Sequence, residues 1–318
     1  MTATAMNIYS DVSAIGASLR GAVLAVGNFD GVHLGHQRIL EAGTTQAASL
    51  GTEMVVMTFE PHPLAVLTPD HAPARLTSFD EKVRLFARAG VHSVIRLVAD
   101  QRLLALPAET FVQEILVAHI RPSHIVEGPG FRFGQGRKGD VDLLRAMARE
   151  ADFQLHIVEH YRLALASQTA CTVSSTLIRR FLANGAVEDA AACLGRPYCL
   201  VGAVARGDGA GRHLGFPTMN LAVPGQLVPA EGVYAGRAEV ANVRAAAAIS
   251  VGRRPTLSGH ELVVEAYVLD QTGDWYGRTA RLEFVRRIRD QVRFDTREAL
   301  TRQIARDVEA VRAGIREL

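Results

Sequence analysis

The feature that most constrains the fold is a change in hydrophobic pattern part-way along the chain. Through residue 158, short apolar runs alternate with segments of helical periodicity. Repeated strand–helix alternation predicts an α/β domain whose parallel sheet is covered by helices on both faces. In such folds a ligand binds beyond the carboxyl ends of the strands. The runs predicted as buried strands are 22–26, 54–59, 91–98, 124–126 and 153–158.

Helices are expected between these runs. Ser78 and Glu81 have capping-box spacing, and we expect the helix that follows them to bury Val83, Phe86 and Ala87 on one face. Other helical segments are expected at 37–48, 107–120, 141–151, 173–183 and 187–194.

From Leu200 onward the pattern is different, because short β-like runs are separated by glycine turns. This pattern predicts a small antiparallel barrel or sandwich. One long helix closes the chain: Asp295 to Glu298 can cap it. Its expected apolar stripe is Leu300, Ile304, Val308, Val311 and Ile315. We place the boundary within 185–195 and divide the chain into domains 1–190 and 191–318, because a single core rarely grows to 318 residues.

Composition excludes several classes of protein. Hydrophobic residues make up 48% and charged residues 21%, as in globular proteins, and the net charge of +2 is too small to indicate a nucleic-acid or membrane surface. The three cysteines form no CxxC pair and their number is odd, which favours a reducing compartment over a disulfide framework. With no apolar leader and no run long enough to cross a bilayer, we expect a cytoplasmic protein. A weak homo-oligomer is an open expectation.

The densest motif in the first half is Gly27–His36, which follows a predicted strand and enters a helix. His33 and His36 lie three residues apart and can donate hydrogen bonds to phosphate oxygens at the helix start, while Gly35 allows close approach of a nucleotide. Together with Asp30, they suit nucleotidyl transfer, in which a phosphate attacks the α-phosphate of ATP. The alternatives are a metal pair or structural loop histidines.

Two other segments can contribute to the same nucleotidyl-transfer site. Ser175 and Thr176 at a helix start, with Arg179 one turn later, would suit a polyphosphate, although Ser174 to Thr176 also fit a simple N-cap. Thr58 and His62 fit either a nucleotide site or an ordinary strand end and loop.

A glycine-rich segment, 202–220, carries the chemistry of the second half. Its glycines can offer backbone N–H groups to phosphates, although a surface hairpin is the alternative. Thr218 and Asn220 alternate along an extended stretch, so both can face one side, and their oxygens suit Mg²⁺. Glu265 lies in a probable strand and is either an outward-facing residue or a general base for hydroxyl-to-phosphate transfer.

The N-terminal motifs resemble a known enzyme family. The stretch from Phe29 to His36 is similar to the HxGH signature of Rossmann-like nucleotidyltransferases. Residues 58–63 (TFEPHP) and 174–179 (SSTLIR) resemble motifs of bacterial bifunctional riboflavin kinase/FAD synthetases. The resemblance implies that His33 and His36 are catalytic. It also implies that ATP contacts Asp30, Gly35, Ser175, Thr176 and Arg179.

The segment 127–134 (EGPGFRFG) resembles the family's flavin- and nucleotide-site loop, and implies that Phe131 and His62 contact flavin. One position departs from the family pattern. Before Phe131 the family usually carries Asn or Asp, whereas this chain has Gly130. Loss of one positioned polar contact can cost about 2–4 kcal/mol in the transition state.

The C-terminal motifs resemble riboflavin kinase, an antiparallel β-barrel with a C-terminal helix. Residues 209–220 (GAGRHLGFPTMN) resemble its flavin and ATP entry, which implies ATP contacts at Gly207, Gly209 and Gly211. Thr218 and Asn220 match its Mg²⁺–nucleotide ligands, and Glu265 matches its catalytic base. Residues 250–256 (SVGRRPT) resemble the family's NIGxRPT motif. Arg289 and Phe294 lie in a stretch that resembles the family's segment before the final helix, which borders the flavin site. Milder departures are Ser250 for Asn and Gln271 for an aromatic residue.

The function implied by this resemblance is ATP-dependent conversion of riboflavin to FMN and of FMN to FAD, with Mg²⁺ as cofactor. Riboflavin, FMN and ATP would be the substrates. Three alternatives are a kinase whose N-terminal module is impaired or non-catalytic, a non-catalytic flavin-binding protein, and a nucleotidyltransferase for another small phosphate.

Overall fold

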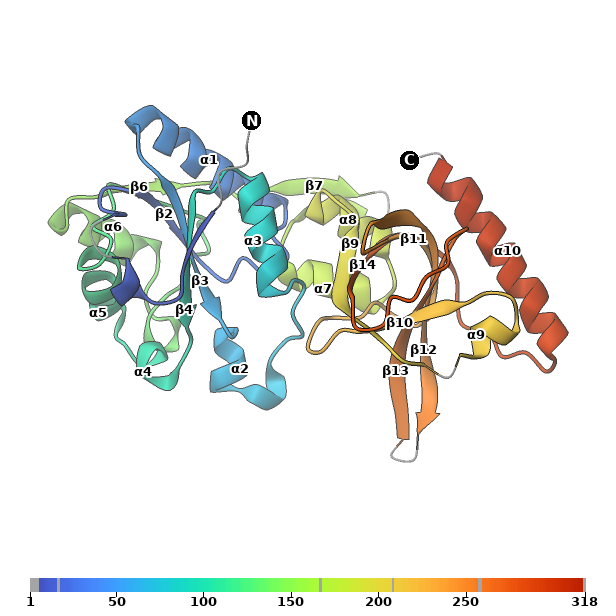
Figure 1. Cartoon of the computed structure of the whole chain (residues 1–318). Helices are drawn as coiled ribbons and strands as arrows, with labels where there is room; N and C mark the ends of the chain where they lie inside the picture. The colour runs from blue at the N-terminus through green and yellow to red at the C-terminus, as the bar shows by residue number, and fades with distance from the viewer. Residues whose placement is uncertain (1–5, 16–17, 166–167, 208, 257–258, 317–318) are drawn as a thin grey trace. The chain divides into compact units, whose positions relative to one another are not determined.

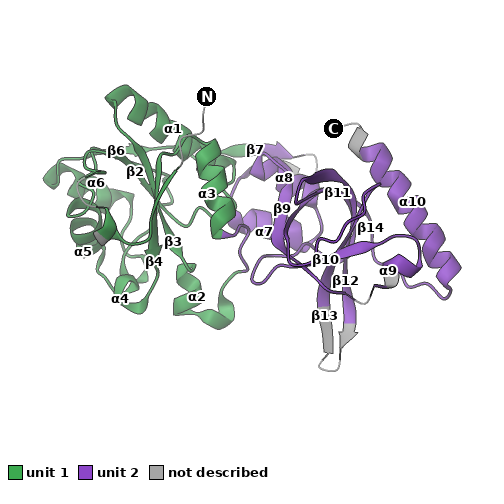
Figure 2. Cartoon of the chain, viewed as in Figure 1, with its two compact units in different colours: residues 1–73, 79–162 green, residues 74–78, 163–318 purple. Residues whose placement is uncertain are grey.

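A computed structural model describes residues 6–15, 18–165, 168–207, 209–256 and 259–316 (Figure 1). The chain forms two compact units, each described here by itself. Unit 1 comprises Met1–Pro73 and Phe79–Arg162, and unit 2 comprises Ala74–Ser78 and Leu163–Leu318 (Figure 2). Within the described residues, no helix has the length and apolar character that a bilayer crossing requires.

Unit 1 is built on a six-stranded sheet in the order β1-β4-β3-β2-β5-β6, and every pair in it is parallel. The predicted parallel sheet is therefore confirmed, with β1 as an edge strand that the apolar runs did not indicate. The strands are β1 Asn7–Tyr9, β2 Val23–Val26, β3 Met54–Glu60, β4 Ser93–Val98, β5 His124–Glu127 and β6 Gln154–Ile157.

Both faces of this sheet are covered, which explains why its central strands are apolar throughout. Along β2, Leu24 and Val26 belong to one core cluster while Val23 and Ala25 belong to the other. Alternate residues of a strand point to opposite faces, so the two clusters are the two sides of the sheet.

The helices of unit 1 largely match the expected segments. They are α1 Leu34–Leu50, α2 Pro63–Leu67, α3 Phe79–Arg88, α4 Gln101–Leu104, α5 Ala108–Thr110 and α6 Val141–Glu150. A π-helical segment Phe111–Val117 continues α5, and 3-10 turns occupy Val12–Ala14, Pro69–His71 and Gln135–Arg137.

The expected buried face of α3 was partly wrong. Phe86 is fully buried, but Val83 is only half-buried and Ala87 is exposed. Lys82 and Leu85 lie on the buried face instead, at 4% and 7% exposure. Lys82 can occupy the buried face because its ammonium group lies 3.3 Å from Glu60 Oε2 and 3.4 Å from Thr58 Oγ1.

The strand order of unit 1 reverses between β2 and β5. From β2 the chain builds outward through β3 and β4 on one side, then returns to place β5 and β6 on the other. The carboxyl ends of β2 and β5 therefore flank the switch point, where open α/β sheets bind ligands. The loops that leave these two ends are the Gly27–His33 stretch and the stretch that begins at Gly128.

Unit 2 contains a closed antiparallel barrel in the order β10-β13-β12-β11-β14-β9, so a barrel rather than a sandwich forms. Its strands are β9 Tyr198–Ala205, β10 Thr218–Ala222, β11 Gly232–Val240, β12 Val243–Thr256, β13 Gly259–Val268 and β14 Thr279–Arg289. A two-stranded sheet (β7 Arg162–Leu165, β8 Gln168–Thr172) and two helices (α7 Ser175–Ala183, α8 Val187–Leu194) precede the barrel.

Two further helices complete unit 2: α9 Ala210–His213 and α10 Arg297–Arg316. Val308 and Val311 of α10 are buried in a cluster with Ala235 and Leu269 of the barrel region, so the expected stripe does pack inward. Its last member, Ile315, has a side chain outside the described residues. The first turn of α10 is capped by Thr296, whose Oγ1 accepts a hydrogen bond from Ala299 N at 3.2 Å.

Candidate active sites for nucleotidyl and phosphoryl transfer

The two histidines of the Gly27–His36 motif lie together at the start of α1. His33 is the N-cap residue of α1, and its Nδ1 accepts a hydrogen bond from His36 N at 3.3 Å. The two rings stack with centroids 3.6 Å apart, and Phe29 meets the His36 ring edge-on at 5.1 Å. His33 and Asp30 are both 6% exposed. Stacked imidazoles at a helix N-terminus form a site suited to an anionic phosphate.

The backbone of this loop is strained where it turns into the helix. Phe29 and Val32 adopt left-handed conformations, with φ of 47° and 40°, which non-glycine residues rarely adopt. Such conformations persist only where the surrounding contacts impose them, and they cluster at functional sites. The strained loop therefore agrees with a functional role for the motif.

The buried side chain of Lys82 contacts this loop and was not predicted from the sequence. Lys82 Nζ lies 3.3 Å from Glu60 Oε2 and 3.4 Å from Thr58 Oγ1, and it donates to Asn28 O at 3.5 Å. The only sequence signal was a charged residue beside Leu85 and Phe86 on an amphipathic helix.

Residues of the TFEPHP stretch reach the same loop. Thr58 Oγ1 donates to Asn28 O at 3.2 Å, and Asn28 Nδ2 lies 3.2 Å from His62 Nε2. Thr58 and His62 thus hold Asn28, which precedes the histidine pair. The predicted flavin contact of His62 is not tested by this arrangement and stays a prediction.

The loop after β5 carries the other predicted contacts of unit 1. The rings of Phe131 and Phe133 stack at 5.2 Å. Gly130 has room for a side chain, because a β-carbon there would meet only His160 Cε1, at an ordinary 3.7 Å. Glu127, at the end of β5, is 3% exposed and accepts a hydrogen bond from Val26 N at 2.6 Å.

The segment with Ser175, Thr176 and Arg179 groups with unit 2. Ser174 is the N-cap of α7 and its hydroxyl accepts from Leu177 N at 3.2 Å, so the capping role is present. Arg179 Nε donates to Ala74 O at 3.0 Å. The expected approach of these residues to the histidine pair stays a prediction.

In unit 2, β10 and β13 bring together three predicted site residues. Asn220 is paired with Glu265 across the antiparallel ladder, and Thr218 with Tyr267. On β10, Met219 lies between Thr218 and Asn220, Leu221 follows them, and both are buried. On β13, the residues on either side of Glu265, Val264 and Ala266, are also buried. Since side chains alternate, Thr218, Asn220 and Glu265 project together on the face away from the barrel core.

The glycine-rich loop lies directly over these residues. A β-carbon at Gly207 would overlap the Asn220 amide, and one at Gly211 would overlap Phe216 O and come within 3.1 Å of Thr218 Oγ1. Gly209 adopts φ of +69°. The absence of side chains at Gly207 and Gly211 therefore allows the loop to cover Thr218 and Asn220 closely.

Each half of the chain matches a known protein family. A FAD synthetase family model matches residues 16–176, and a riboflavin kinase model matches residues 194–315. The bifunctional riboflavin kinase/FMN adenylyltransferase of Escherichia coli K12 is 37% identical over 296 residues, covering 92% of each chain. That of Haemophilus influenzae is 35% identical over 297 residues, covering 93% of this chain and 94% of its own.

The chain belongs to the bifunctional riboflavin kinase/FMN adenylyltransferases. It is therefore an enzyme with both transferase modules, and the comparisons favour this conclusion over a kinase with a non-catalytic N-terminal module. A crystal structure described as a macrolide-efflux protein from Streptococcus pneumoniae has the same fold, with a TM-score of 0.84 and 29% identity. The match covers 96% of this chain and 98% of that one. The expected boundary at 190–191 falls between the two family matches and stays a prediction.

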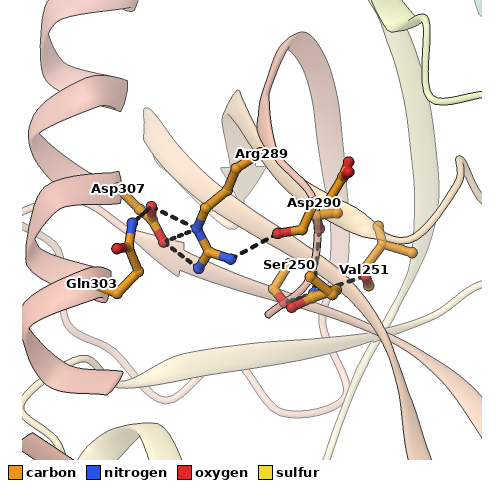
Figure 3. Close-up of polar contacts among 8 residues, drawn as sticks. Ser250, Val251, Arg289, Asp290, Gln303 and Asp307 are labelled. Carbon is orange, nitrogen blue, oxygen red and sulfur yellow. Dashed lines mark hydrogen bonds and ion pairs between the residues drawn. The ribbon is translucent and has the colours of Figure 1, made fainter. Parts of the chain in front are cut away.

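In the kinase module, Arg289 is held by α10 (Figure 3). Its Nε and Nη2 form a forked pair with the Asp307 carboxylate at 2.7–3.1 Å, and Gln303 Nε2 donates to the same carboxylate at 2.9 Å. Asp307 is 4% exposed. The Arg289 guanidinium also lies 5.9 Å from the Phe294 ring, which links the two predicted flavin-site residues.

Gly207→Ala should damage the kinase without unfolding it. The added methyl group would displace the flexible Asn220 amide rather than backbone, so the stability cost is small but the predicted ligand moves. We expect kcat/KM for ATP in FMN formation to fall about 10- to 100-fold, the size typical of misplaced reacting groups. Gly277→Asn is the control, since Gly277 has φ of +74° and open space around it. Unchanged kinase kinetics for Gly207→Ala would contradict the close loop contact.

We expect Glu127 to make the free energy of unfolding of unit 1 depend on pH. Burial raises the pKa of this carboxyl well above its usual range, opposed by hydrogen bonds from Val26 and Gly128 backbone N–H groups. The folded state then binds a proton more tightly than the unfolded state. Its stabilising contribution is complete below the ordinary Glu pKa of about 4.3 and is lost as pH rises through the raised folded pKa.

We expect Glu127→Gln to remove this contribution, so that its free energy of unfolding declines less than that of the parent as pH rises from mildly acidic to neutral. Urea unfolding of parent and variant across that interval measures the difference. Glu150→Gln, at an exposed helix end, is the control and should track the parent. Parallel curves for parent and Glu127→Gln would show that the carboxyl does not titrate in this interval.

Proposed function

We propose that riboflavin is phosphorylated at the face formed by Thr218, Asn220 and Glu265. The riboflavin 5′-hydroxyl oxygen attacks the γ-phosphorus of ATP, its proton passes to the Glu265 carboxylate, and ADP leaves. FMN is the product. The observation that carries this proposal is the direct pairing of Asn220 with Glu265 in the barrel, because it places a carboxylate beside the predicted nucleotide-binding strand.

Thr218 and Asn220 would hold Mg²⁺. A hydroxyl and an amide oxygen on one face, beneath a loop that can bind phosphates, form a donor set that suits Mg²⁺, which takes few protein ligands together with phosphate oxygens. When bound, Mg²⁺ would neutralise charge on the phosphates. Gly207, Gly209 and Gly211 would offer backbone N–H groups to ATP.

FMN adenylylation is proposed for the switch point of unit 1. An FMN phosphate oxygen attacks the α-phosphorus of ATP, the bond to the β-phosphate oxygen breaks, and pyrophosphate leaves with FAD as product. His33 and His36 would donate hydrogen bonds to phosphate oxygens as charge shifts, and the start of α1 would add its N–H groups. Asp30 and Gly35 would contact ATP.

Flavin contacts are proposed at Phe131 and His62 for adenylylation, and at Arg289 and Phe294 for the kinase. The packing of Phe131 on Phe133 and of Arg289 near Phe294 gives these side chains fixed positions that a planar ring system could use. Cys171, Cys193 and Cys199 are free thiols, which suits the cytoplasm.

The test is chromatography of purified protein incubated with riboflavin, ATP and Mg²⁺. We expect FMN to form first and FAD to follow. Chelation of the divalent ion should stop FMN formation. A reaction that yields no FMN would refute the kinase proposal, and FMN that never proceeds to FAD would refute the adenylyltransferase proposal alone.

A further inference from the structure

The Glu265 carboxylate has a cationic partner on the neighbouring strand. Arg254 Nη2 of β12 donates to Glu265 Oε1 of β13 at 2.9 Å, and both side chains are 33% exposed. Partly exposed ion pairs usually contribute little to stability, because solvent screens the attraction. Stability alone is therefore a weak explanation for this contact. Because Arg254 lies beside the proposed base, a role in catalysis is the better explanation.

The sheet register shows that the contact is not simply a pair of facing residues. Across β12 and β13, Glu265 is opposite Ser250, whereas Arg254 is opposite Glu261. Ser250, Gly252 and Arg254 share one face of β12, because strand side chains alternate. Gly252 has no side chain of its own, and the Gln291 side chain packs over it. The Arg254 side chain extends along the strand to reach Glu265.

Among the residues that the structure describes on the adjacent strands, the two register partners of Glu265 carry no ionisable side chain. Its register partners are Asn220 on β10 and Ser250 on β12, and neither titrates. Along β13, the same-face neighbours are Val263 and Tyr267. Ser250 is itself held by Gln291, whose Nε2 lies 2.9 Å from Ser250 Oγ and donates to Val251 O at 2.9 Å. The carboxylate is thus oriented by Arg254 on one side and faces Asn220 on the other.

We infer that Arg254 is a positioning residue for phosphoryl transfer, which fixes the Glu265 carboxylate toward the substrate hydroxyl. The inference rests on the proposed role of Glu265. A charged hydrogen bond from a guanidinium restricts the carboxylate rotamer more than contact with solvent water would. A base held in one orientation accepts the proton without first being ordered.

Arg254→Met should lower kcat for FMN formation about 10- to 100-fold, while KM for riboflavin and for ATP changes less than about threefold. Arg254→Lys should recover part of the loss. Arg253→Met is the matched control: this neighbouring arginine pairs with Glu231 at 2.8 Å. An unchanged KM for riboflavin reports that the barrel of each variant is folded, and FMN-to-FAD conversion in the same samples reports that unit 1 is intact.

A double-mutant cycle separates action through Glu265 from a general effect. In a Glu265→Gln background, Arg254→Met should cause no further fall in kcat, because the carboxylate that it orients is gone. Independent, multiplying losses would overturn the inference, and so would a large rise in KM for ATP alone, which would make Arg254 a nucleotide contact. Failure of the proposed function is distinguishable, since Glu265→Gln would then keep its activity.

Discussion

Glu265→Gln is expected to lower kcat for FMN formation by about 10²- to 10⁴-fold, the usual contribution of a positioned general base. Glutamine keeps the size of the side chain and can still accept the Arg254 hydrogen bond, but it cannot take up the hydroxyl proton. Binding of riboflavin should stay within about threefold of the parent, because the variant removes a transition-state contribution only. Stopped assays with riboflavin titration, analysed by chromatography, measure both quantities.

Two controls sharpen this prediction. Glu239→Gln changes a barrel glutamate whose Oε2 lies 3.6 Å from Arg281 Nε. This glutamate is not on a strand next to Asn220, so the variant should leave FMN formation unchanged. Conversion of supplied FMN to FAD by Glu265→Gln should match the parent. Parental turnover in Glu265→Gln would remove Glu265 as the base, even if the kinase itself were active.

His36→Ala is expected to lower FAD formation from supplied FMN by about 10²- to 10³-fold, which is the size found when one charge-stabilising donor is removed from an active site. We prefer His36 to His33 for this test, because the His33 imidazole also caps α1. Loss of the His36 ring removes a stacking partner of His33 but no helix cap.

Riboflavin phosphorylation measured on the same preparation should be unaffected by His36→Ala. His71→Ala is the matched substitution, because His71 is an exposed histidine of the same unit in a 3-10 turn. If His36→Ala and His71→Ala made FAD at equal rates, the stacked histidines would be structural loop residues.

The parallel sheet and the barrel could both be predicted from hydrophobic periodicity. A strand buried on both faces is apolar at every position, whereas a strand buried on one face is apolar at alternate positions. Val23–Val26 is apolar at every position because both faces of the sheet are covered, and β10 alternates because only one face is. The edge strand Asn7–Tyr9 escaped detection because it is largely exposed and carries no buried run.

The site was predictable in its residue types but not in its geometry. Which residue of β13 faces Asn220 depends on the register of strands far apart in sequence, and a shift by one residue would turn Glu265 to the other face. Lys82 looked like a solvated helix residue because its partners Thr58 and Glu60 come from another element. Arg254 likewise reaches Glu265 only through the pairing of β12 with β13.

The most direct test is a crystal structure of the whole chain with Mg²⁺, ADP and FMN. We expect the metal within about 2.1 Å of the Thr218 hydroxyl or the Asn220 amide oxygen, the distance typical of Mg²⁺ ligands. We also expect the FMN 5′-oxygen within about 3.2 Å of the Glu265 carboxylate. Mg²⁺–ADP bound away from β10, or a flavin chain that ends far from Glu265, would contradict the proposed kinase site.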